Sequence, residues 1–248
     1  MVLLSFNITD SDLFLDNRLK IGPEKLLEVI KKNTERLLRV LEHHDVPATF
    51  FIASHLVPEL EILTKEVYSK GHEIGLYHNG NWGDTEKAQQ LVLKFIGKSA
   101  KGIRVFDHFL AKEISAHHFY YISPVEKMKL TYLFKRLSRN TAIYTDSEVD
   151  VIPESIAPVT QFPYNETIFQ YLPMKYYENM VFETLKSSEY VLVYLNMLQF
   201  TDFSYHKIPI PFFRRYNTGL KMEEKLDGLL TWINDNDFAT STMKDFVM

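Results

Sequence analysis

The chain has 248 residues and a formal net charge of −4, from 28 basic and 32 acidic side chains. No basic run or stripe stands out, so we expect no nucleic-acid partner, and the absence of cysteine excludes disulfides, thiolate metal sites and a cysteine nucleophile. Hydrophobic residues make up 46% of the chain, which excludes an intrinsically disordered protein and predicts a globular one with a large core.

The chain begins with a short apolar run, Val2 to Ile8, that is typical of a buried parallel strand. No cationic region precedes this run, so we expect a strand and no signal peptide. No window approaches the roughly 20 apolar residues that a membrane span needs. We therefore expect a cytoplasmic protein without a membrane span.

Strands and helices are expected to alternate along the first half of the chain. Pro23 opens a helix whose leucines recur at helical spacing up to Leu41. The elements expected after it are a strand at 48–53, a helix from Pro58 to Lys70 capped by Gly71, a strand at 72–77, a helix at 84–97, a strand at 102–106, a short helix at 110–116 and a strand at 119–122. This alternation indicates βα units and a parallel sheet.

A polar stretch at about 125–139, predicted to be helical, interrupts the alternation. The elements expected after it are strands at 141–145 and 149–152, a proline-containing segment to Pro173, a helix at 174–187, a strong strand at 190–195, a loop with Pro209 and Pro211, a helix at 219–234 and a last strand at 238–241. Since there is no repeat, low-complexity tract or linker, we expect a single domain over residues 1–248.

Three short motifs follow one another between residues 48 and 75. They are Ala48-Thr49-Phe50-Phe51-Ile52, Pro58-Glu59-Leu60 and Gly71-His72-Glu73-Ile74-Gly75. In this order and at these distances they resemble the polysaccharide deacetylase family, also called the NodB homology or carbohydrate esterase type. Runs at 152–155, 168–173, 190–200 and 213–216 resemble the bacterial branch of that family associated with exopolysaccharide and surface glycans. The resemblance implies an α/β fold, a distorted (β/α) barrel of about seven parallel strands with a groove at their carboxyl ends.

The resemblance also implies a chemistry, metal-assisted hydrolysis of an amide. In the family an Asp and two His hold a divalent ion, usually Zn²⁺, which polarises the acetyl carbonyl and activates water. A second Asp is the general base, an Arg positions that base, and a late His is the general acid.

This sequence departs from the family at the base and at all three metal ligands. Asn7 occupies the base position, and an amide cannot accept a proton near neutral pH. The metal-binding Asp falls on Ile8 or Thr9, neither of which is an anionic ligand. The two metal-binding histidines fall on Tyr77 and Asn81.

Arg104 matches the arginine that positions the base, although the proline that usually follows is absent, and the general acid falls on Asn196. The family's catalytic positions are therefore Asn7, Arg104 and Asn196. We expect a neutral pocket of amides and hydroxyls, formed by Asn7, Thr9, Asp10, Tyr77, His78, Asn81, Arg104 and Asn196. No cofactor is expected, and Zn²⁺ or another divalent metal would bind only if the site had been rebuilt.

Other side chains have a structural as well as a functional interpretation. Asp10 and Asp12 suit turn or capping positions. Arg214-Arg215 suits a solvated pair better than a phosphate clamp. Aromatic residues after the strand at 190–195 suit either a sugar-stacking platform or packing of the fold; they are Phe200, Phe203, Tyr205, Phe212, Phe213 and Tyr216.

Nine histidines could contribute to a metal site; they are His43, His44, His55, His72, His78, His108, His117, His118 and His206. His43 and His44 end a helix, where a cation suits the helix dipole. His72 belongs to the Gly71–Gly75 motif and is expected to be structural. Only His78 and His108 follow a barrel strand closely enough to be pocket candidates.

Three hypotheses for function remain open. The first is an inactive deacetylase homologue that binds a glycan, a sugar ligand without a nucleotide, or a partner protein in bacterial surface-polysaccharide metabolism. The second is an active metal-dependent N-deacetylase of acetamido sugars, rebuilt from Asp10 or Asp12 with His78 or His108. The third is a structural subunit of a glycan-synthesis complex whose contacts use residues 125–140 or 197–216. The sequence does not give the oligomeric state.

Overall fold

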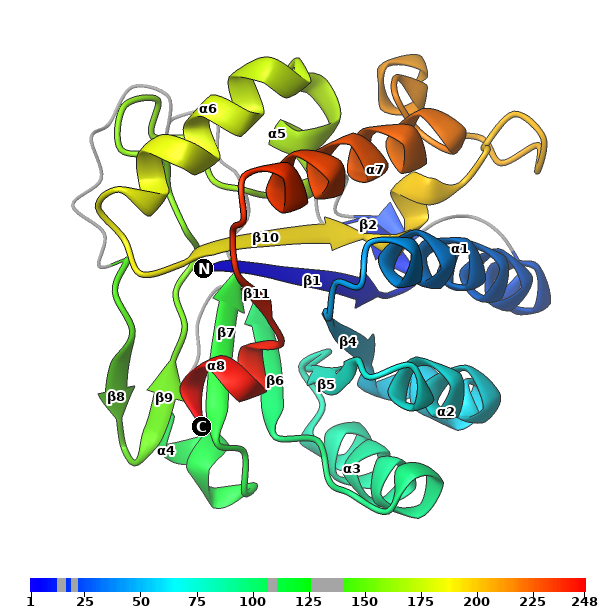
Figure 1. Cartoon of the computed structure of the whole chain (residues 1–248). Coiled ribbons are helices and arrows are strands. Elements are labelled where there is room, and N and C mark those ends of the chain that lie inside the picture. The colour runs from blue at the N-terminus through cyan, green and yellow to red at the C-terminus, as the bar shows by residue number, and fades with distance from the viewer. Residues whose placement is uncertain (13–16, 19–21, 107–110, 126–140) are drawn as a thin grey trace.

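The computed structural model describes residues 1–12, 17–18, 22–106, 111–125 and 141–248, with 11–12 and 17–18 described by their backbone alone. His108 and residues 126–140, which hold nearly all of the predicted polar helix, lie outside the described residues. A curled sheet forms the centre of the molecule and helices surround it (Figure 1). None of the described helices is both long enough and apolar enough to cross a membrane.

The sheet contains nine strands among the described residues. They are β1 (Val2–Ile8), β4 (Thr49–Ala53), β5 (Glu73–Tyr77), β6 (Gly102–Phe106), β7 (Tyr121–Val125), β8 (Tyr144–Asp146), β9 (Val149–Val151), β10 (Val191–Asn196) and β11 (Thr240–Ser241). Their order is β10-β1-β4-β5-β6-β7-β9-β8, and β11 pairs with the start of β1. All neighbours are parallel except β8 and β9. The predicted distorted barrel of about seven parallel strands is confirmed by the run from β10 to β9.

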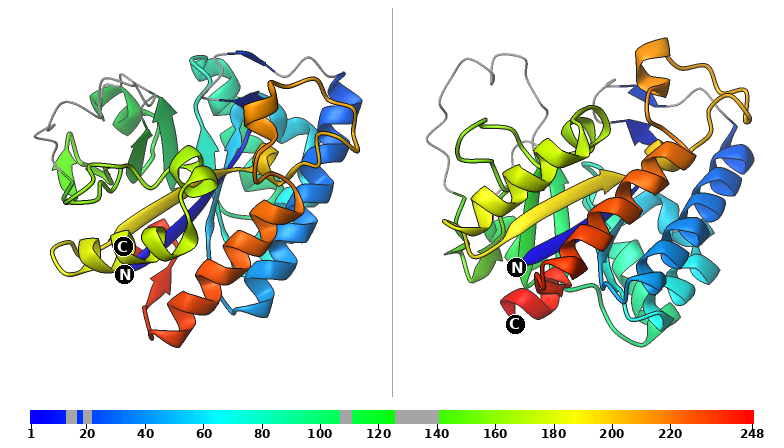
Figure 2. Two further views of the ribbon diagram at one scale, coloured as in Figure 1. Left: turned by 90° about the horizontal axis from the view of Figure 1, so that it is seen from above. Right: turned by 45° about the horizontal axis from the view of Figure 1, so that its top comes forward.

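Helices connect the strands and lie around the outside of the sheet (Figure 2). They are α1 (Pro23–His43), α2 (Glu61–Ser69), α3 (Trp82–Ile96), α4 (Ala111–Ala116), α5 (Glu166–Tyr171), α6 (Met174–Leu185), α7 (Leu220–Asp235) and α8 (Met243–Val247). Three short 3₁₀ helices, η1 (Ser54–Glu59), η3 (Met197–Phe200) and η4 (Phe212–Arg215), and a small hairpin of β2 (Ser11–Asp12) and β3 (Asn17–Arg18) complete the described elements.

Local hydrogen bonds explain where the observed elements differ from those predicted. The helix predicted to start at Pro58 starts at Glu61, because Pro58 belongs to η1, which ends with a bond of 3.1 Å from the N–H of Leu60 to the carbonyl of Val57. Neither α5 nor α8 was predicted. Each is shorter than two turns, so no helical periodicity marks it, and each begins at a capping side chain, Asn165 for α5 and Thr242 for α8.

The Gly71–Gly75 motif ties the amino-terminal ends of the strands together. Glu73 is buried and accepts hydrogen bonds from Thr49 Oγ1 at 2.8 Å, from Tyr121 Oη at 2.7 Å and from the backbone N–H of Lys244 at 2.9 Å. One carboxylate thus joins β4, β7 and α8 to β5. Burial raises the pKa of Glu73, and the three donors oppose that shift.

His72, the neighbour of Glu73, also has a structural contact. Its Nδ1 atom accepts a hydrogen bond of 3.2 Å from the backbone N–H of Ala48, just before β4. Burial lowers the pKa of His72 to about 4, so the ring is neutral at physiological pH. The contacts of this motif therefore join the strands at their amino-terminal ends, opposite the carboxyl-terminal end of the barrel.

Two glycines leave room for aromatic rings inside the barrel. A Cβ atom on Gly75 would lie 2.6 Å from the ring of Phe51, and one on Gly102 would lie 2.0 Å from the ring of Tyr121. Both distances are too short for a side chain, so close packing requires glycine at these positions. The space at Gly102 is what allows Tyr121 to reach Glu73.

Candidate functional site

Four of the predicted pocket residues lie on neighbouring strands at the carboxyl-terminal end of the barrel. Asn7 on β1 is in register with Asn196 on β10. Tyr77 on β5 is in register with Arg104 on β6. All four side chains are buried. The parallel sheet thus brings these residues to one end of the fold, where (β/α) barrels form their sites.

Arg104 is the centre of a buried polar cluster. Its Nη1 atom donates to Oδ1 of Asn7 at 2.7 Å, and its Nη2 atom donates to the hydroxyls of Ser5 at 2.9 Å and Ser123 at 3.0 Å. A guanidinium group can only donate hydrogen bonds, so the amide of Asn7 must turn its oxygen toward Arg104. Arg104 therefore contacts Asn7, the residue that the family resemblance predicts at the base position.

The charge of Arg104 has no carboxylate partner at ion-pair distance among the described residues. The guanidinium carbon instead lies 4.1 Å from the ring centre of Phe51 and 5.4 Å from that of Tyr194. Burial lowers the pKa of Arg104 to about 10, so the side chain remains a cation at neutral pH. The ring faces and the serine hydroxyls stabilise the positive charge of Arg104, which an Asp at position 7 would balance directly.

The amide nitrogen of Asn7 is a hydrogen-bond donor, whereas a catalytic base must accept a proton. This Nδ2 atom is buried and meets no hydrogen-bond acceptor in the described part of the chain. An aspartate here would present an oxygen that can accept a proton, whereas the Asn7 amide presents N–H donors. General base catalysis by residue 7 is thereby excluded.

The residues at the metal positions do not fit the divalent ion that the family implies. Ile8 is part of the hydrophobic core, and Thr9 and Tyr77 are buried neutral side chains. Asn81 is exposed, and its Oδ1 atom caps α3 by accepting from the N–H of Gly83 at 3.0 Å. Among the residues that the structure describes, no three His, Cys, Asp or Glu side chains lie close enough together to hold a metal.

Asn196, the residue predicted at the general-acid position, is a helix cap. Asn196 ends β10, and its Oδ1 atom accepts a hydrogen bond of 3.0 Å from the N–H of Leu198 at the start of η3. An amide at this place shapes the loop after β10 but has no proton to give to a leaving group.

The contacts of Asp10 and His78 differ from those that a rebuilt site requires. Asp10 lies 3.3 Å from Nε2 of His55, a residue that the sequence did not mark as a pocket candidate. His78 instead bonds Thr85 through Nδ1 at 2.9 Å and packs on the ring of Trp82. Burial lowers the pKa of His78. The proposed pairing of Asp10 with His78 is therefore absent here, and the side chains of Asp12 and His108 lie outside the described residues.

The sequence missed the two serines that complete the surroundings of Arg104. Ser5 lies two residues before Asn7 on β1, so both side chains face the barrel interior. Ser123 is in register with Arg104 on β7. The period of two along β1 could have found Ser5, but nothing local marks Ser123, which precedes a proline in an apolar strand.

The predicted aromatic platform after β10 is only partly exposed. Phe200 and Phe203 are buried in the core, and so is Arg214, which was expected to be solvated. Tyr205, Phe212, Phe213 and Tyr216 remain exposed. The ring of Tyr216 is stacked against that of Tyr171 from α5, with centroids 5.7 Å apart and planes at 10°. The exposed part of the platform is thus smaller than predicted and gains Tyr171.

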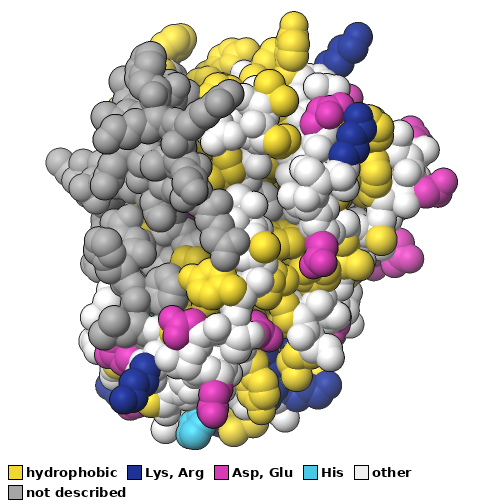
Figure 3. Space-filling model, turned by 90° about the vertical axis from the view of Figure 1, so that its left-hand side faces the viewer, with side chains coloured by type: hydrophobic (Ala, Val, Ile, Leu, Met, Phe, Trp, Pro, Cys, Tyr) yellow, Lys and Arg dark blue, Asp and Glu magenta, His cyan; other side chains and the backbone are white. Residues whose placement is uncertain are grey.

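Exposed hydrophobic side chains also occur away from this loop. On the side of the molecule that carries β8 and β9, hydrophobic groups reach the surface among charged ones (Figure 3). Tyr176 and Phe182 of α6 and Tyr144 of β8 are exposed as well. Exposure alone therefore does not mark a binding surface on this protein, and the stacking of Tyr171 on Tyr216 is the more specific feature.

The fold is a curled, mostly parallel (β/α) barrel with a buried polar cluster at the carboxyl ends of its strands. A family model described as polysaccharide deacetylase matches residues 21–104. The peptidoglycan-N-acetylglucosamine deacetylase of Bacillus cereus (strain ATCC 14579) is 37% identical over 81 residues, which cover 28% of this chain and 30% of that protein.

Solved structures are similar over nearly the whole chain. A probable polysaccharide deacetylase from Pseudomonas aeruginosa PAO1 has a TM-score of 0.65 and 13% identity, covering 98% of this chain and 88% of its own. A CE4 family pseudoenzyme from Bacillus anthracis has a TM-score of 0.50 and 12% identity, covering 99% of this chain and 64% of its own. A mutant of that pseudoenzyme with restored enzymatic activity has a TM-score of 0.54. Residues 21–104 are therefore similar to the polysaccharide deacetylase family, and the fold over nearly the whole chain is similar to that of solved polysaccharide deacetylases.

Proposed function

We propose that residues 1–248 form one deacetylase-like domain that is catalytically inactive and binds a glycan in bacterial surface-polysaccharide metabolism. The observation that carries this proposal is the bond of 2.7 Å between Arg104 Nη1 and Asn7 Oδ1. Arg104 and the strand ends are in place, but Asn7 has an amide oxygen, which is not basic and already accepts from Arg104.

Each step of amide hydrolysis lacks its group. Water activation needs a base and an ion, whereas Asn7 presents a donor and the three metal positions are apolar, phenolic or engaged in a helix cap. Departure of the amine needs an acid, whereas Asn196 holds the N–H of Leu198. These losses are on different strands of the same end of the barrel, which supports loss of the reaction as a whole.

Glycan binding is supported by the chemistry that remains at this end. Sugars offer hydroxyl groups to amide donors and acceptors, and apolar ring faces to aromatic side chains. The stacked pair joins Tyr171, at the end of α5 before β10, to Tyr216, just after η4, which contains the exposed Phe212 and Phe213. Tyr171 is further fixed by a hydrogen bond of 2.5 Å to the carbonyl of Phe213.

The decisive experiment measures acetate release from N-acetylglucosamine oligomers and peptidoglycan fragments, with Zn²⁺, Co²⁺ or Mn²⁺ added. The wild-type protein should release no acetate above the blank. A variant with Asn7→Asp, Ile8→Asp, Tyr77→His, Asn81→His and Asn196→His combined should bind one ion and gain activity. Metal-dependent acetate release by the wild-type protein would refute the proposal.

A metal analysis tests the rebuilt-site alternative, which the sequence placed on Asp10 or Asp12 with His78 or His108. In the structure Asp10 has His55 as a neighbour instead. The contact of 3.3 Å between them supplies only two ligands. If this alternative were true, purified protein would contain stoichiometric metal, and His55→Ala would remove it. The structural-subunit alternative predicts instead that deletion of residues 125–140 leaves a folded barrel that no longer co-purifies with its partners.

A further inference from the structure

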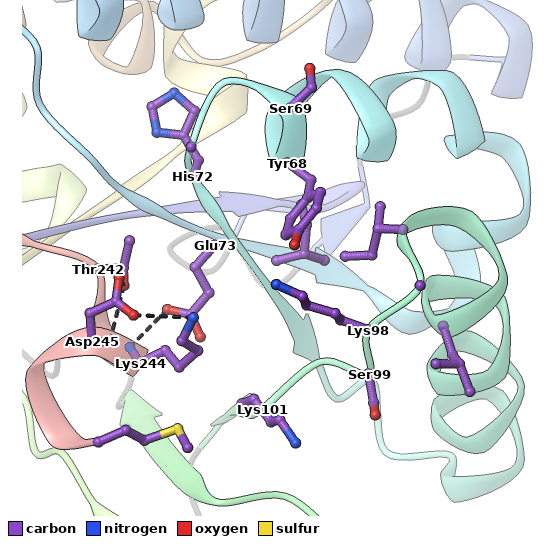
Figure 4. Close-up of a pocket in the computed structure, with 16 residues that line it drawn as sticks. Tyr68, Ser69, His72, Glu73, Lys98, Ser99, Lys101, Thr242, Lys244 and Asp245 are labelled. Carbon is purple, nitrogen blue, oxygen red and sulfur yellow. Dashed lines mark hydrogen bonds and ion pairs between the residues drawn. The ribbon is translucent and has the colours of Figure 1, made fainter.

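A second pocket, of about 610 Å³, opens at the amino-terminal end of the barrel, away from the candidate site. It lies between the ends of α2 and α3 and the start of α8, with Glu73 of β5 at its floor (Figure 4). None of the residues assigned to the deacetylase chemistry lines it. Its volume is in the range of pockets that bind small molecules.

Positive charge is concentrated at this pocket, although the whole chain has a net charge of −4. Three lysines line it, Lys98, Lys101 and Lys244. Within the described part of the chain, Lys98 and Lys101 make no ion pair, and their ammonium groups instead lie 5.6 Å and 4.1 Å from the ring centres of Tyr68 and Tyr120. Lys98 points into the pocket (Figure 4).

The two acidic side chains of the lining do not neutralise Lys98 and Lys101. Asp245 is already engaged, because it lies 3.1 Å from Nζ of Lys244 and accepts from Thr242 Oγ1 at 2.8 Å. Glu73 is buried beneath the pocket and already accepts three hydrogen bonds from the protein. Lys98 and Lys101 therefore remain as uncompensated cations, which favour an anionic ligand.

Part of the remaining lining is apolar. The side chains of Ile74, Leu93, Ile96 and Met248 and the ring of Tyr68 form the walls. A free inorganic ion would use the lysines and leave these walls uncovered. A ligand with a ring-shaped body and an attached anion would use both.

We propose that this pocket is a binding site for an organic phosphate, a sugar phosphate or a nucleotide. The phosphate binds Lys98, which points into the pocket, while Lys101 adds positive charge at its rim, and the sugar ring packs between Tyr68 and the apolar walls. A phosphate dianion carries two negative charges and a carboxylate carries one, so the two lysines attract a phosphate more strongly. This site is independent of the proposed glycan site at the other end of the barrel.

The test is isothermal titration calorimetry at low salt with glucose 1-phosphate, uridine monophosphate and inorganic phosphate. Glucose and uridine serve as neutral partners of the first two, and glucuronate serves as a carboxylate. At least one organic phosphate should bind in the micromolar to low-millimolar range, more tightly than inorganic phosphate, and the neutral compounds should not bind. Tighter binding of glucose 1-phosphate would identify the ligand as a sugar phosphate, and tighter binding of uridine monophosphate would identify it as a nucleotide.

Two doubly substituted variants separate a site from diffuse charge. Lys98→Gln/Lys101→Gln should weaken binding by about tenfold or more. Lys87→Gln/Lys94→Gln removes the same charge from exposed positions of α3 outside the pocket and should leave the affinity unchanged. Ser99→Trp, which fills the pocket and removes no charge, should weaken the organic phosphates but not inorganic phosphate.

Several results would overturn the proposal. One is the absence of binding of either organic phosphate at about 10 mM to protein shown to be folded by circular dichroism. Another is an equal loss of affinity in the two lysine variants, which would indicate diffuse electrostatic attraction. Equally tight binding of glucuronate or of inorganic phosphate, or no effect of Ser99→Trp, would also contradict it.

Discussion

Arg104 donates a hydrogen bond of 2.7 Å to Asn7, so its guanidinium meets an amide where the family resemblance predicts a carboxylate. The Arg104 guanidinium lies at the centre of the barrel, and residue 7 gives it no carboxylate. Ser5, Ser123 and the rings of Phe51 and Tyr194 surround it. The cluster therefore stabilises the barrel, and a base can be restored to it by a change of one atom.

The change Asn7→Asp should stabilise the protein, because it places a carboxylate on a buried cation. We expect the free energy of unfolding at pH 7 to rise by about 1–3 kcal/mol. Arg104 should hold the pKa of the new carboxyl low, so the gain should be lost as the pH falls and the carboxyl is protonated. Urea unfolding at pH 7 and at acidic pH measures both effects.

Asn33→Asp is the matched control for this change. Asn33 is also buried, but its amide nitrogen donates to the Met197 carbonyl at 3.2 Å and to Thr201 Oγ1 at 2.8 Å. The same substitution there removes a donor and adds an unpaired charge, so it should destabilise the protein. If Asn7→Asp destabilised the protein as much as Asn33→Asp, the described cluster would not be as cationic as we infer.

The sequence could predict which strand ends meet but not what surrounds them. Asn7, Tyr77, Arg104 and Asn196 each end or lie within a strongly apolar strand, and parallel strands bring their carboxyl ends to one side of a sheet. Their convergence follows from the strand pattern alone. Contacts such as that of Ser123 with Arg104 depend on register across the sheet, which no local pattern reveals.

The loop after β10 was less predictable for a similar reason. Arg214 follows two aromatic residues and precedes another arginine, a pattern that favours exposure, yet it is buried. Its backbone carbonyl accepts from Nε2 of Gln170 at 3.2 Å, so α5 fixes this part of the loop. Because α5 itself escaped prediction, the tertiary contact that buries Arg214 could not be foreseen.

The stacked tyrosines provide a prediction for glycan binding. Tyr216→Ala and Tyr171→Ala should each weaken binding of N-acetylglucosamine oligomers by about threefold to tenfold, because each removes one ring of the pair. Tyr176→Ala, at an exposed position of α6, is the control and should change nothing. Calorimetry or a glycan array measures the affinity, and an equal effect of all three changes would contradict a platform at Tyr171 and Tyr216.

Glu73 predicts a pH effect at the other end of the barrel. Its pKa is raised in the folded protein, so between the unfolded value of 4.5 and the raised value the folded state binds the extra proton. This carboxyl therefore makes stability fall as the pH rises through that window. Glu73→Gln keeps an acceptor for Thr49 and Lys244 and should abolish this dependence while the protein stays folded.

Glu73→Ala separates the charge of this residue from its hydrogen bonds. It leaves the hydroxyls of Thr49 and Tyr121 and the N–H of Lys244 without their shared acceptor. We expect a loss of about 2–4 kcal/mol in the free energy of unfolding, far more than for Glu73→Gln. Similar losses for the two variants in urea unfolding would show that the charge, not the hydrogen bonding, is the essential feature.

His72 should have the opposite pH effect to its neighbour. Its pKa is lowered from 6.5 to about 4, so between these values the unfolded chain binds a proton that the folded chain does not. Stability should therefore fall as the pH drops from 6.5 toward 4, by about 3 kcal/mol at most. His72→Asn keeps an acceptor for the N–H of Ala48 but cannot titrate, so its stability should fall less over the same range. Urea unfolding of both proteins at several pH values gives the two slopes, and because the Glu73 carboxyl is common to both, the difference between the slopes isolates the imidazole. Equal slopes would mean that His72 binds protons equally well in the folded and unfolded protein. That result would contradict the neutral ring that accepts from Ala48.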